Sequence, residues 1–300
     1  MSDAHRIKSI TELHELAGAP PPEHPMVSLV RLEDLPVLPE GYPHSFIYEF
    51  YSIGFKKNLK GYVAYGRKKY DFQEGVLGFT APNQMMSFTG SDASEATGWL
   101  LFFHEEILAG HPLAEKIYDY GFFKYTVNEG LHLSQKEEET INGIFENMHD
   151  EHVQRVDQFS KNVLVSSLEL LLTYAQRFYS RQFIMRNDVD SSFIDRFDHQ
   201  LRTYLRSNNL PQAGIPTVEV FAEKLNISAS YLSDMLKSLT GKTTKEHIHY
   251  QLMEMAKEQL LASDEAVAQI AYNLGFEYPQ YFNRLFKEKT GMTPKEYRMS

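Results

Sequence analysis

The sequence predicts an α+β protein, with a β-rich N-terminal domain and an all-α C-terminal domain that holds two helix-turn-helix modules joined by a long helix. Three observations predict this class. Residues 26–133 contain short runs of β-branched and aromatic residues separated by Gly and Asn. Apolar residues recur at helical spacing after residue 134. A segment of the last hundred residues occurs twice, and a length of 300 residues indicates two or three domains.

Composition limits the function classes. The chain has no cysteine, which excludes disulfides, thiolate metal sites and cysteine nucleophiles and is typical of a reducing cytoplasm. The net charge of −10 argues against binding nucleic acid by bulk charge, and this excess lies in residues 1–191, because residues 192–300 are neutral overall. The first residues lack a signal peptide, and the longest apolar runs, such as 99–103, are too short to cross a bilayer. We therefore expect a cytoplasmic protein with no membrane partner.

The N-terminal part is expected to start with an arm and continue as strands. Residues 1–25 combine a short helix, about 7–16, with a cluster of prolines, which is typical of an arm or linker. The strand-like runs of residues 26–133 have the spacing of a sandwich or barrel. A helix over about 112–120 interrupts this pattern near its end.

Two helices are expected after the strands. Ser134 and Glu137 match a capping box at the start of the first helix. The second, about 156–183, carries a wide apolar stripe that either packs against the β domain or forms a dimer interface. The stripe consists of Phe159, Val163, Leu164, Leu168, Leu171, Leu172 and Ala175. Residues 187–192 have the composition of a linker, so the predicted domains are 26–186 and 193–300.

An internal repeat is the most informative feature of the sequence. Residues 236–246 recur as 286–296, and residues 221–227 recur as 270–276. The two offsets differ by one residue, and the difference falls at an expected turn, where an insertion is tolerated best. Two copies are too few for a solenoid, so the repeat predicts a duplicated small helical module.

Each copy has the pattern of a helix-turn-helix. Asn226 and Gly275 follow the first helices of the two copies, and both residue types tolerate the left-handed conformation that ends a helix. Ser228 is expected to cap the second helix of the first copy. Each second helix carries an apolar stripe that is expected to face inward: Tyr231, Leu232, Met235, Leu236 and Leu239 in the first copy, and Tyr281, Phe282, Leu285 and Phe286 in the second.

The polar side chains on the outer face of each second helix are candidates for reading DNA. Arg and Asn form bidentate contacts with guanine and adenine edges, and Lys contacts phosphate, whereas Asp repels phosphate. A helix over about 243–261 would hold the two second helices apart, and successive major grooves lie about 34 Å apart. The candidates are Ser230, Ser233, Asp234 and Lys237 in the first copy and Gln280, Asn283, Arg284 and Lys287 in the second.

Residues 193–298 resemble the AraC/XylS family of bacterial transcription regulators, most specifically at 270–276, 281–287 and 291–298. The resemblance implies a sequence-specific DNA-binding regulator, usually an activator. Its implied partners are double-stranded DNA, RNA polymerase and a second copy of the chain as a homodimer. The chain departs from the family pattern at Asp234, where the family commonly has arginine, and at Gln251, where arginine is frequent. Both departures remove positive charge.

The same resemblance implies that the N-terminal domain is a cupin-like β-barrel with flanking helices that dimerises and senses a small-molecule effector. The aromatic residues that either line an effector pocket or form core are Tyr51, Tyr62, Tyr65, Phe88, Trp99 and Phe103. One alternative is a regulator that needs no ligand and whose barrel only dimerises. Another is a metal-dependent cupin enzyme. In the β region, His44 and His104 lie far apart in the sequence and form no close His-x-His pair, and no phosphate loop or nucleophile motif is present. We therefore expect no enzyme activity, no cofactor and no metal.

Overall fold

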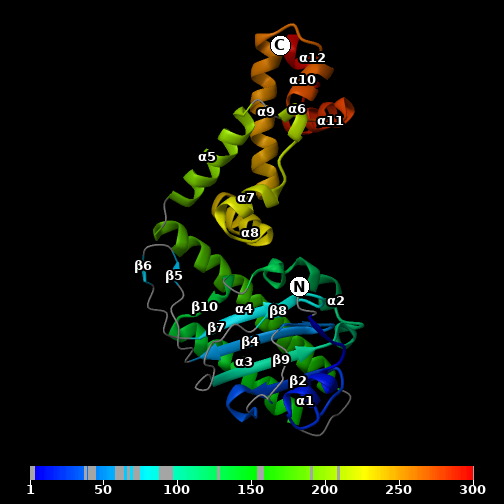
Figure 1. The fold of residues 1–300 in the computed structure, drawn as a ribbon, viewed down its shortest axis with the longest axis vertical. Helices are drawn as coiled ribbons and strands as arrows, with labels where there is room; N and C mark the ends of the chain where they lie inside the picture. Colours follow the sequence, from blue (N-terminus) through cyan, green and yellow to red (C-terminus); the bar gives the residue numbers. More distant parts are fainter. Residues whose placement is uncertain are drawn as a thin grey trace. The chain divides into compact units, whose positions relative to one another are not determined.

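The computed structural model describes residues 4–36, 39, 45–57, 64–65, 68–69, 75–87, 97–126, 129–153, 159–189, 192–207 and 210–299. The chain divides into two compact units, Met1–Gln182 and Phe183–Ser300. All described strands lie in the first unit, and the described elements of the second are helices (Figure 1). The predicted order of a β-rich domain followed by an all-α domain is confirmed.

A five-stranded antiparallel sheet in the order β10-β7-β4-β9-β2 forms the centre of the first unit. Its strands are β2 (Val27–Arg31), β4 (Tyr51–Lys57), β7 (Val76–Thr80), β9 (Thr97–Phe103) and β10 (Leu131–His132). A second sheet has the order β1-β3-β8, and a third pairs β5 with β6. These strands are β1 (His5–Ile7), β3 (Ser45–Tyr48), β5 (Ala64–Tyr65), β6 (Lys68–Lys69) and β8 (Met85–Ser87). Among the described strands the three sheets stay separate, so they do not show the closed barrel that was expected.

The N-terminal residues are integrated into this unit, which differs from the expected arm. β1 pairs in parallel with β3, and α1 (Ile10–Ala17) follows after the Ser9 side chain caps the amide of Glu12. Ile7, Ile10 and Leu13 are buried in one cluster with aromatic residues of the sheets. This burial explains why the segment is ordered against the unit. The cluster also contains Phe46, Tyr48, Phe50 and Phe102.

Short helical turns connect β9 to β10, and two long helices complete the unit. The turns are η2 (Glu105–Leu108), α2 (Leu113–Lys116), η3 (Ile117–Asp119) and η4 (Gly121–Lys124). The long helices are α3 (Gln135–Val153) and α4 (Ser160–Val189). On α4, Leu168, Leu171, Leu172 and Ala175 are buried within the chain, whereas Val163 is 42% exposed and Phe159, just before the helix, is 60% exposed. The apolar stripe is therefore divided between intrachain packing and an exposed end.

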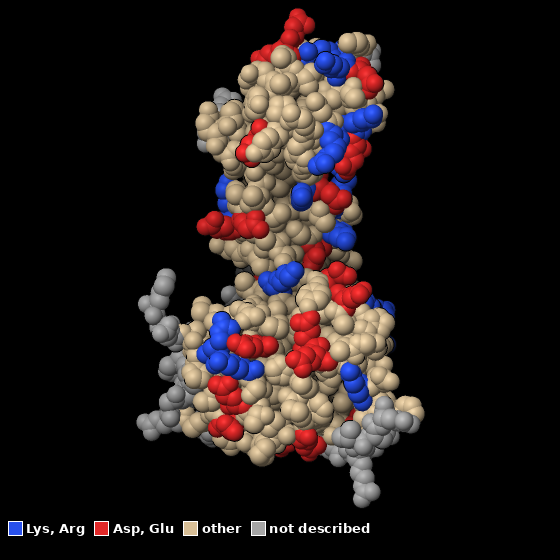
Figure 2. Space-filling model, turned by 90° about the vertical axis from the view of Figure 1, so that its right-hand side faces the viewer, with Lys and Arg blue, Asp and Glu red and all other residues tan. Residues whose placement is uncertain are grey.

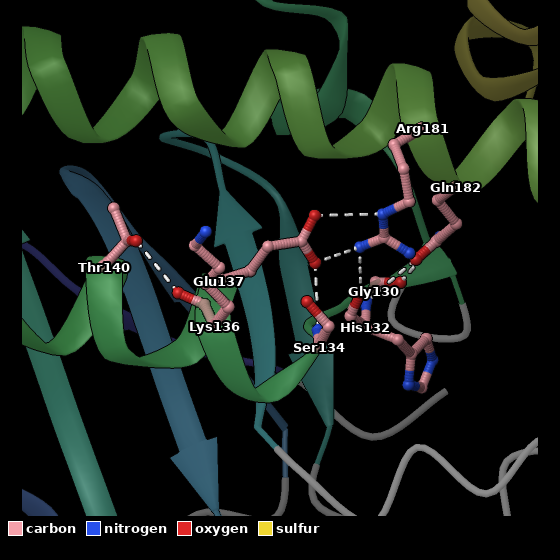
Figure 3. A network of polar contacts seen from close by, with 8 residues as sticks. All are labelled: Gly130, His132, Ser134, Lys136, Glu137, Thr140, Arg181 and Gln182. Carbon is pink, nitrogen blue, oxygen red and sulfur yellow. Dashed lines mark hydrogen bonds and ion pairs between the residues drawn. The ribbon is translucent and has the colours of Figure 1, made fainter.

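A polar network attaches the C-terminal part of α4 to β10 and to the start of α3 (Figure 3). The Arg181 guanidinium donates to the Glu137 carboxylate at 3.1 and 2.6 Å and to the His132 carbonyl at 2.7 Å. The Gln182 side chain accepts from the His132 amide at 2.9 Å. Glu137 also accepts from the Ser134 amide at 2.9 Å, which is one half of the predicted capping box. Burial and the nearby Arg181 lower the pKa of His132 to about 4.

The second unit contains α5 to α12. These are α5 (Ser192–Arg206), α6 (Leu210–Ala213), α7 (Val218–Leu225), α8 (Ala229–Thr240), α9 (Thr244–Ala262), α10 (Val267–Asn273), α11 (Pro279–Thr290) and α12 (Pro294–Met299). The predicted helix over about 243–261 is α9, and it lies between the pair α7–α8 and the pair α10–α11 in the chain. Residues 187–189 of the expected linker belong to the end of α4. No helix in the described part of the chain combines the length and apolar character that a membrane crossing requires.

Candidate nucleic-acid interface

The first module is α7, a tight turn and α8. Asn226 ends α7 in the left-handed conformation with a φ of 55°, as its residue type predicts. The amides of Asn226 and Ile227 then donate to the carbonyls of Glu223 and Ala222 at 3.1 Å each. Ser228 caps α8 by accepting from the Tyr231 amide at 3.1 Å, which confirms its predicted role. The turn therefore satisfies the backbone groups at the end of one helix and the start of the next.

The second module repeats this geometry in α10 and α11. Gly275 follows α10 with a φ of +83°. A Cβ atom at this position would lie 3.0 Å from the backbone of Gly214 and of Leu210, so the segment after α6 packs directly on the turn. Pro279 occupies the start of α11, where the missing amide hydrogen costs nothing. Glycine is thus needed here for its conformation and for its lack of a side chain.

The repeat extends to the hydrogen bonds of the helices that follow α8 and α11. At the start of α9, the Glu246 carboxylate accepts from the Thr243 amide at 2.7 Å, and the Thr243 hydroxyl accepts from the Glu246 amide at 3.3 Å. Thr293 and Glu296 make the same two bonds at the start of α12, also at 2.7 and 3.3 Å. These bonds lower the pKa of both glutamates. Two capping boxes therefore fix the ends of the two modules in the same way.

The predicted inner face of α11 is correct at three of its four positions. Phe282, Leu285 and Phe286 are buried, but Tyr281 is 37% exposed. The prediction that Tyr281 faces inward was wrong. In the first module the corresponding residue, Tyr231, is fully buried and contacts the Phe183 ring edge-to-face at 5.0 Å. The two modules thus differ at this position.

Four polar side chains form the outer surface of α11, which we call the α11 face: Gln280, Asn283, Arg284 and Lys287. All four are exposed, and none is seen to form a hydrogen bond or an ion pair with another residue of the described chain. The Arg284 guanidinium lies 5.4 Å from the centre of the Tyr281 ring. The exposed tyrosine therefore supports the arginine by a cation–π contact. Sequence spacing had assigned Tyr281 to the core, so this contact was missed.

The corresponding α8 face consists of Ser230, Ser233, Asp234 and Lys237. Only Lys237 is fully exposed, and the other three are half-buried. The Ser233 hydroxyl donates to the Thr244 hydroxyl at 3.2 Å and so connects α8 to α9. The α8 face consequently offers fewer free polar groups than the α11 face.

Charge is mixed over the molecular surface. Figure 2 shows Lys and Arg side chains interspersed with Asp and Glu, without a large area of one sign on the face drawn. Residues 192–300 are also neutral overall. Any preference for nucleic acid must therefore come from the placement of particular side chains and not from bulk charge.

Of the residues proposed for an effector pocket, the structure describes the side chains of Tyr51, Trp99 and Phe103. Trp99 is 1% exposed and belongs to the core, where its indole donates to the Asn142 side chain at 3.1 Å and its ring stacks on Phe145. Phe103 is buried and stacks on Tyr51 with ring centres 5.0 Å apart. Tyr51 lines a cavity that is described below. Tyr62 and Phe88 lie outside the described residues, as does the side chain of Tyr65. Within the described residues, no group of three or more His, Asp or Glu is arranged to hold a metal ion.

Comparison with known proteins agrees with this geometry. A family model described as "Helix-turn-helix domain" matches residues 221–300. The regulatory protein SoxS of Salmonella typhimurium is 31% identical over 81 residues, which cover 27% of this chain and 76% of SoxS. The MmsAB operon regulatory protein of Pseudomonas aeruginosa is 29% identical over 98 residues, 33% of this chain and 31% of that protein.

A solved structure, the C-terminal domain of the response regulator yesN from Fusobacterium nucleatum, is 33% identical. The match covers 34% of this chain and 96% of that domain, with a TM-score of 0.30. The chain spans 54% of the length of one curated relative, an uncharacterised regulator of Pseudoalteromonas carrageenovora, and 31% of the MmsAB operon regulatory protein. SoxS, by contrast, is matched over 76% of its length at 31% identity. The chain therefore belongs to the AraC/XylS family of transcription regulators.

Proposed function

We propose that this chain is a sequence-specific regulator that reads double-stranded DNA with α8 and α11 in the major groove. The observation that carries the proposal is the α11 face, whose four exposed polar side chains stand on a helix that is held to the core by three buried apolar residues. A helix fits the major groove, and polar side chains on its outer face can reach base edges there.

The four residues of the α11 face have different roles in this proposal. Arg284 contacts a guanine edge and Asn283 an adenine edge, because their paired donors and acceptors match those bases. Gln280 lies one turn earlier and contacts a neighbouring base. Lys287 contacts phosphate and adds affinity that does not depend on sequence.

The α8 face makes a weaker contribution. Lys237 provides a phosphate contact, and Ser230 provides a further hydrogen bond. Asp234 accepts from cytosine and disfavours a close approach to phosphate, while Ser233 must exchange its bond with Thr244 to reach DNA. The first module therefore positions the protein more than it discriminates between bases.

The other proposed functions belong to the two domains of the chain. We propose that residues 193–300 form the DNA-binding domain and that residues 26–186 serve dimerisation and the control of DNA binding by a small molecule. The exposed Val163 on α4 and the exposed Phe159 just before it support a homodimer, because neighbouring exposed apolar side chains favour association. The proposed outcome is activation of transcription through RNA polymerase.

Selection of genomic DNA fragments by the purified full-length protein tests the proposal and supplies a target site. On that site, Asn283→Ala and Arg284→Ala should each weaken binding by roughly 5-fold to 150-fold, the equivalent of about 1–3 kcal/mol, and relax specificity at one base. Lys287→Ala should weaken binding to all sequences and reduce the slope of log affinity against log salt concentration by about 0.9.

Lys295→Ala is the matched control, because Lys295 is an exposed lysine of α12 outside the α11 face. It should leave site preference and affinity almost unchanged. Equal losses in Lys295→Ala and Arg284→Ala would show that net charge and not the α11 face governs binding, and the proposal would be abandoned.

A further inference from the structure

The N-terminal unit contains a cavity of about 220 Å³ that none of the DNA-binding residues lines. It is lined by residues of β4, of the turn after β7 and of the segment 105–124. The rings of Tyr51, Tyr120 and Phe123 are buried and form its floor. Glu105, Tyr118 and Lys124 are exposed and form its rim.

The aromatic floor is a packed group of rings. The Tyr51 and Phe123 rings lie 5.0 Å apart at an angle of 71°. Tyr51 is in turn held in place by parallel stacking on Phe103. Ring faces carry partial negative charge, so an aromatic lining favours a cation over an anion at the floor of the cavity.

The charged groups at the rim favour the same kind of ligand. Glu105 accepts a hydrogen bond from the Tyr118 hydroxyl, which holds the carboxylate beside the cavity. Burial and the negative charge of Glu105 raise the pKa of Tyr51 to about 12, so its phenol remains neutral. The Lys116 ammonium is 5.8 Å from the centre of the Tyr120 ring and is paired with Glu169 at 2.9 Å, which offsets its charge.

The buried hydroxyl of Tyr120 is only weakly bonded. Tyr120 is 3% exposed, and its hydroxyl oxygen forms no hydrogen bond of normal geometry, although it interacts with the Lys116 ammonium and helps to raise the pKa of that lysine. A ligand with a polar end would add a second partner at this hydroxyl after a small movement of the ring.

We propose that this cavity binds a small alkylammonium compound, with the ammonium group against the aromatic rings and Glu105 as its counter-charge. A volume of about 220 Å³ is below the usual range for drug-sized ligands, which restricts the compound to a few heavy atoms around one nitrogen. The ammonium group occurs both in simple cations and in zwitterions that carry a carboxylate. Lys124 at the rim is placed to meet such a carboxylate.

An alkylammonium compound would be the small molecule that controls DNA binding in the function proposed above. Only this effect of the ligand on DNA binding rests on the proposed function. Ligand binding is measured on the full chain without DNA. Loss of ligand binding would therefore contradict this inference alone, whereas failure to select DNA would contradict the proposed function alone.

Isothermal titration with choline, glycine betaine and 3,3-dimethyl-1-butanol tests the proposal. The last compound has the shape of choline without its charge. Choline or glycine betaine should bind at least about tenfold more tightly than the neutral analogue, because the ring faces and the carboxylate attract only the charged form. Equal binding of choline and the neutral analogue, or no binding of either ammonium compound, would overturn the proposal.

Variants then locate the site. Glu105→Gln should weaken ammonium binding several-fold, whereas Glu106→Gln, an exposed neighbour outside the cavity lining, should not. Tyr118→Ala removes an exposed wall that the core does not need and should also weaken binding. Lys124→Met should weaken the binding of glycine betaine and leave the binding of choline unchanged, because only glycine betaine carries a carboxylate. An equal effect on both compounds would contradict a role for Lys124 at the site. A loss of binding in Glu106→Gln equal to that in Glu105→Gln would place the ligand elsewhere.

Discussion

Replacing Gly275 by alanine should lower stability in two ways, through an unfavourable backbone conformation and through steric overlap with neighbouring backbone atoms. Its φ of +83° is unfavourable for a residue with a Cβ by about 1–2 kcal/mol. The new Cβ would also lie 3.0 Å from the backbone of Gly214 and of Leu210, and these atoms cannot turn away as a side chain can. Overpacking of this kind costs about 1–3 kcal/mol more. We therefore expect Gly275→Ala to destabilise the second module by about 3 kcal/mol.

Gly291→Ala provides the matched control. Gly291 ends α11 with a φ of +80°, but no atom lies within 4 Å of its added Cβ, so the substitution meets the conformational cost alone. Its cost should be about 1 kcal/mol. Hydrogen exchange of the α10 and α11 amides in the full-length protein measures the local opening free energy. Exchange should accelerate about 100-fold in Gly275→Ala and about 5-fold in Gly291→Ala. Equal acceleration in the two variants would refute the claim that close packing on the turn, and not its conformation alone, requires glycine.

Two further predictions concern an aromatic support and a buried histidine. Tyr281→Leu should weaken binding to the selected DNA about 2-fold to 5-fold in fluorescence anisotropy, because Arg284 loses its ring contact. Tyr281→Phe keeps the ring and should bind as tightly as the unchanged protein. Equal binding of all three proteins would show that the ring does not support Arg284. The pKa of His132 is about 4 in the folded state, whereas the same side chain in the unfolded chain takes up a proton near pH 6.5. The free energy of unfolding should therefore fall by up to about 3 kcal/mol between pH 6.5 and pH 4 and level off below pH 4. Denaturant unfolding followed by fluorescence of the single tryptophan, Trp99, should show this loss in the unchanged protein and a smaller loss in His132→Gln. Identical pH profiles of the two proteins would disprove the role of His132 in this pH dependence.

The helix-turn-helix modules could be predicted from the sequence because their signals are local. Asn226 and Gly275 end helices, and Ser228 starts one, through conformations and hydrogen bonds within a few residues. The exception shows where local signals fail. Tyr231 and Tyr281 occupy equivalent positions in the repeat, but Tyr231 meets the ring of the distant Phe183, whereas Tyr281 meets that of Phe276 in the adjacent turn. Spacing alone cannot show whether such a neighbour exists.

The N-terminal unit was less predictable because its contacts join distant segments. Ile7 reads as part of a helix or an arm, yet it is buried because β1 pairs with β3, some forty residues further along the chain. The alternation of strands in the sequence likewise does not determine how sheets join or whether they close. An aromatic residue such as Trp99 can equally line a pocket or fill a core, and only the contact with Asn142 and Phe145 decides for the core.

The difference between the two modules has a consequence for how the protein would read a promoter. The α11 face is exposed and unpaired within the described chain, and Tyr281 holds its arginine in place. On the α8 face, Ser233 bonds to α9, and the Asp234 carboxylate disfavours a close approach to phosphate. The two copies of the module would contact bases in a similar way only if the polar side chains on both outer faces were free to bind DNA. We therefore expect base discrimination to be concentrated in the half of the site contacted by α11, while the first module contributes mainly affinity and register. Because α9 is fixed at its start by a capping box and packs through buried residues along its length, the spacing of the two half-contacts should vary little between target sites.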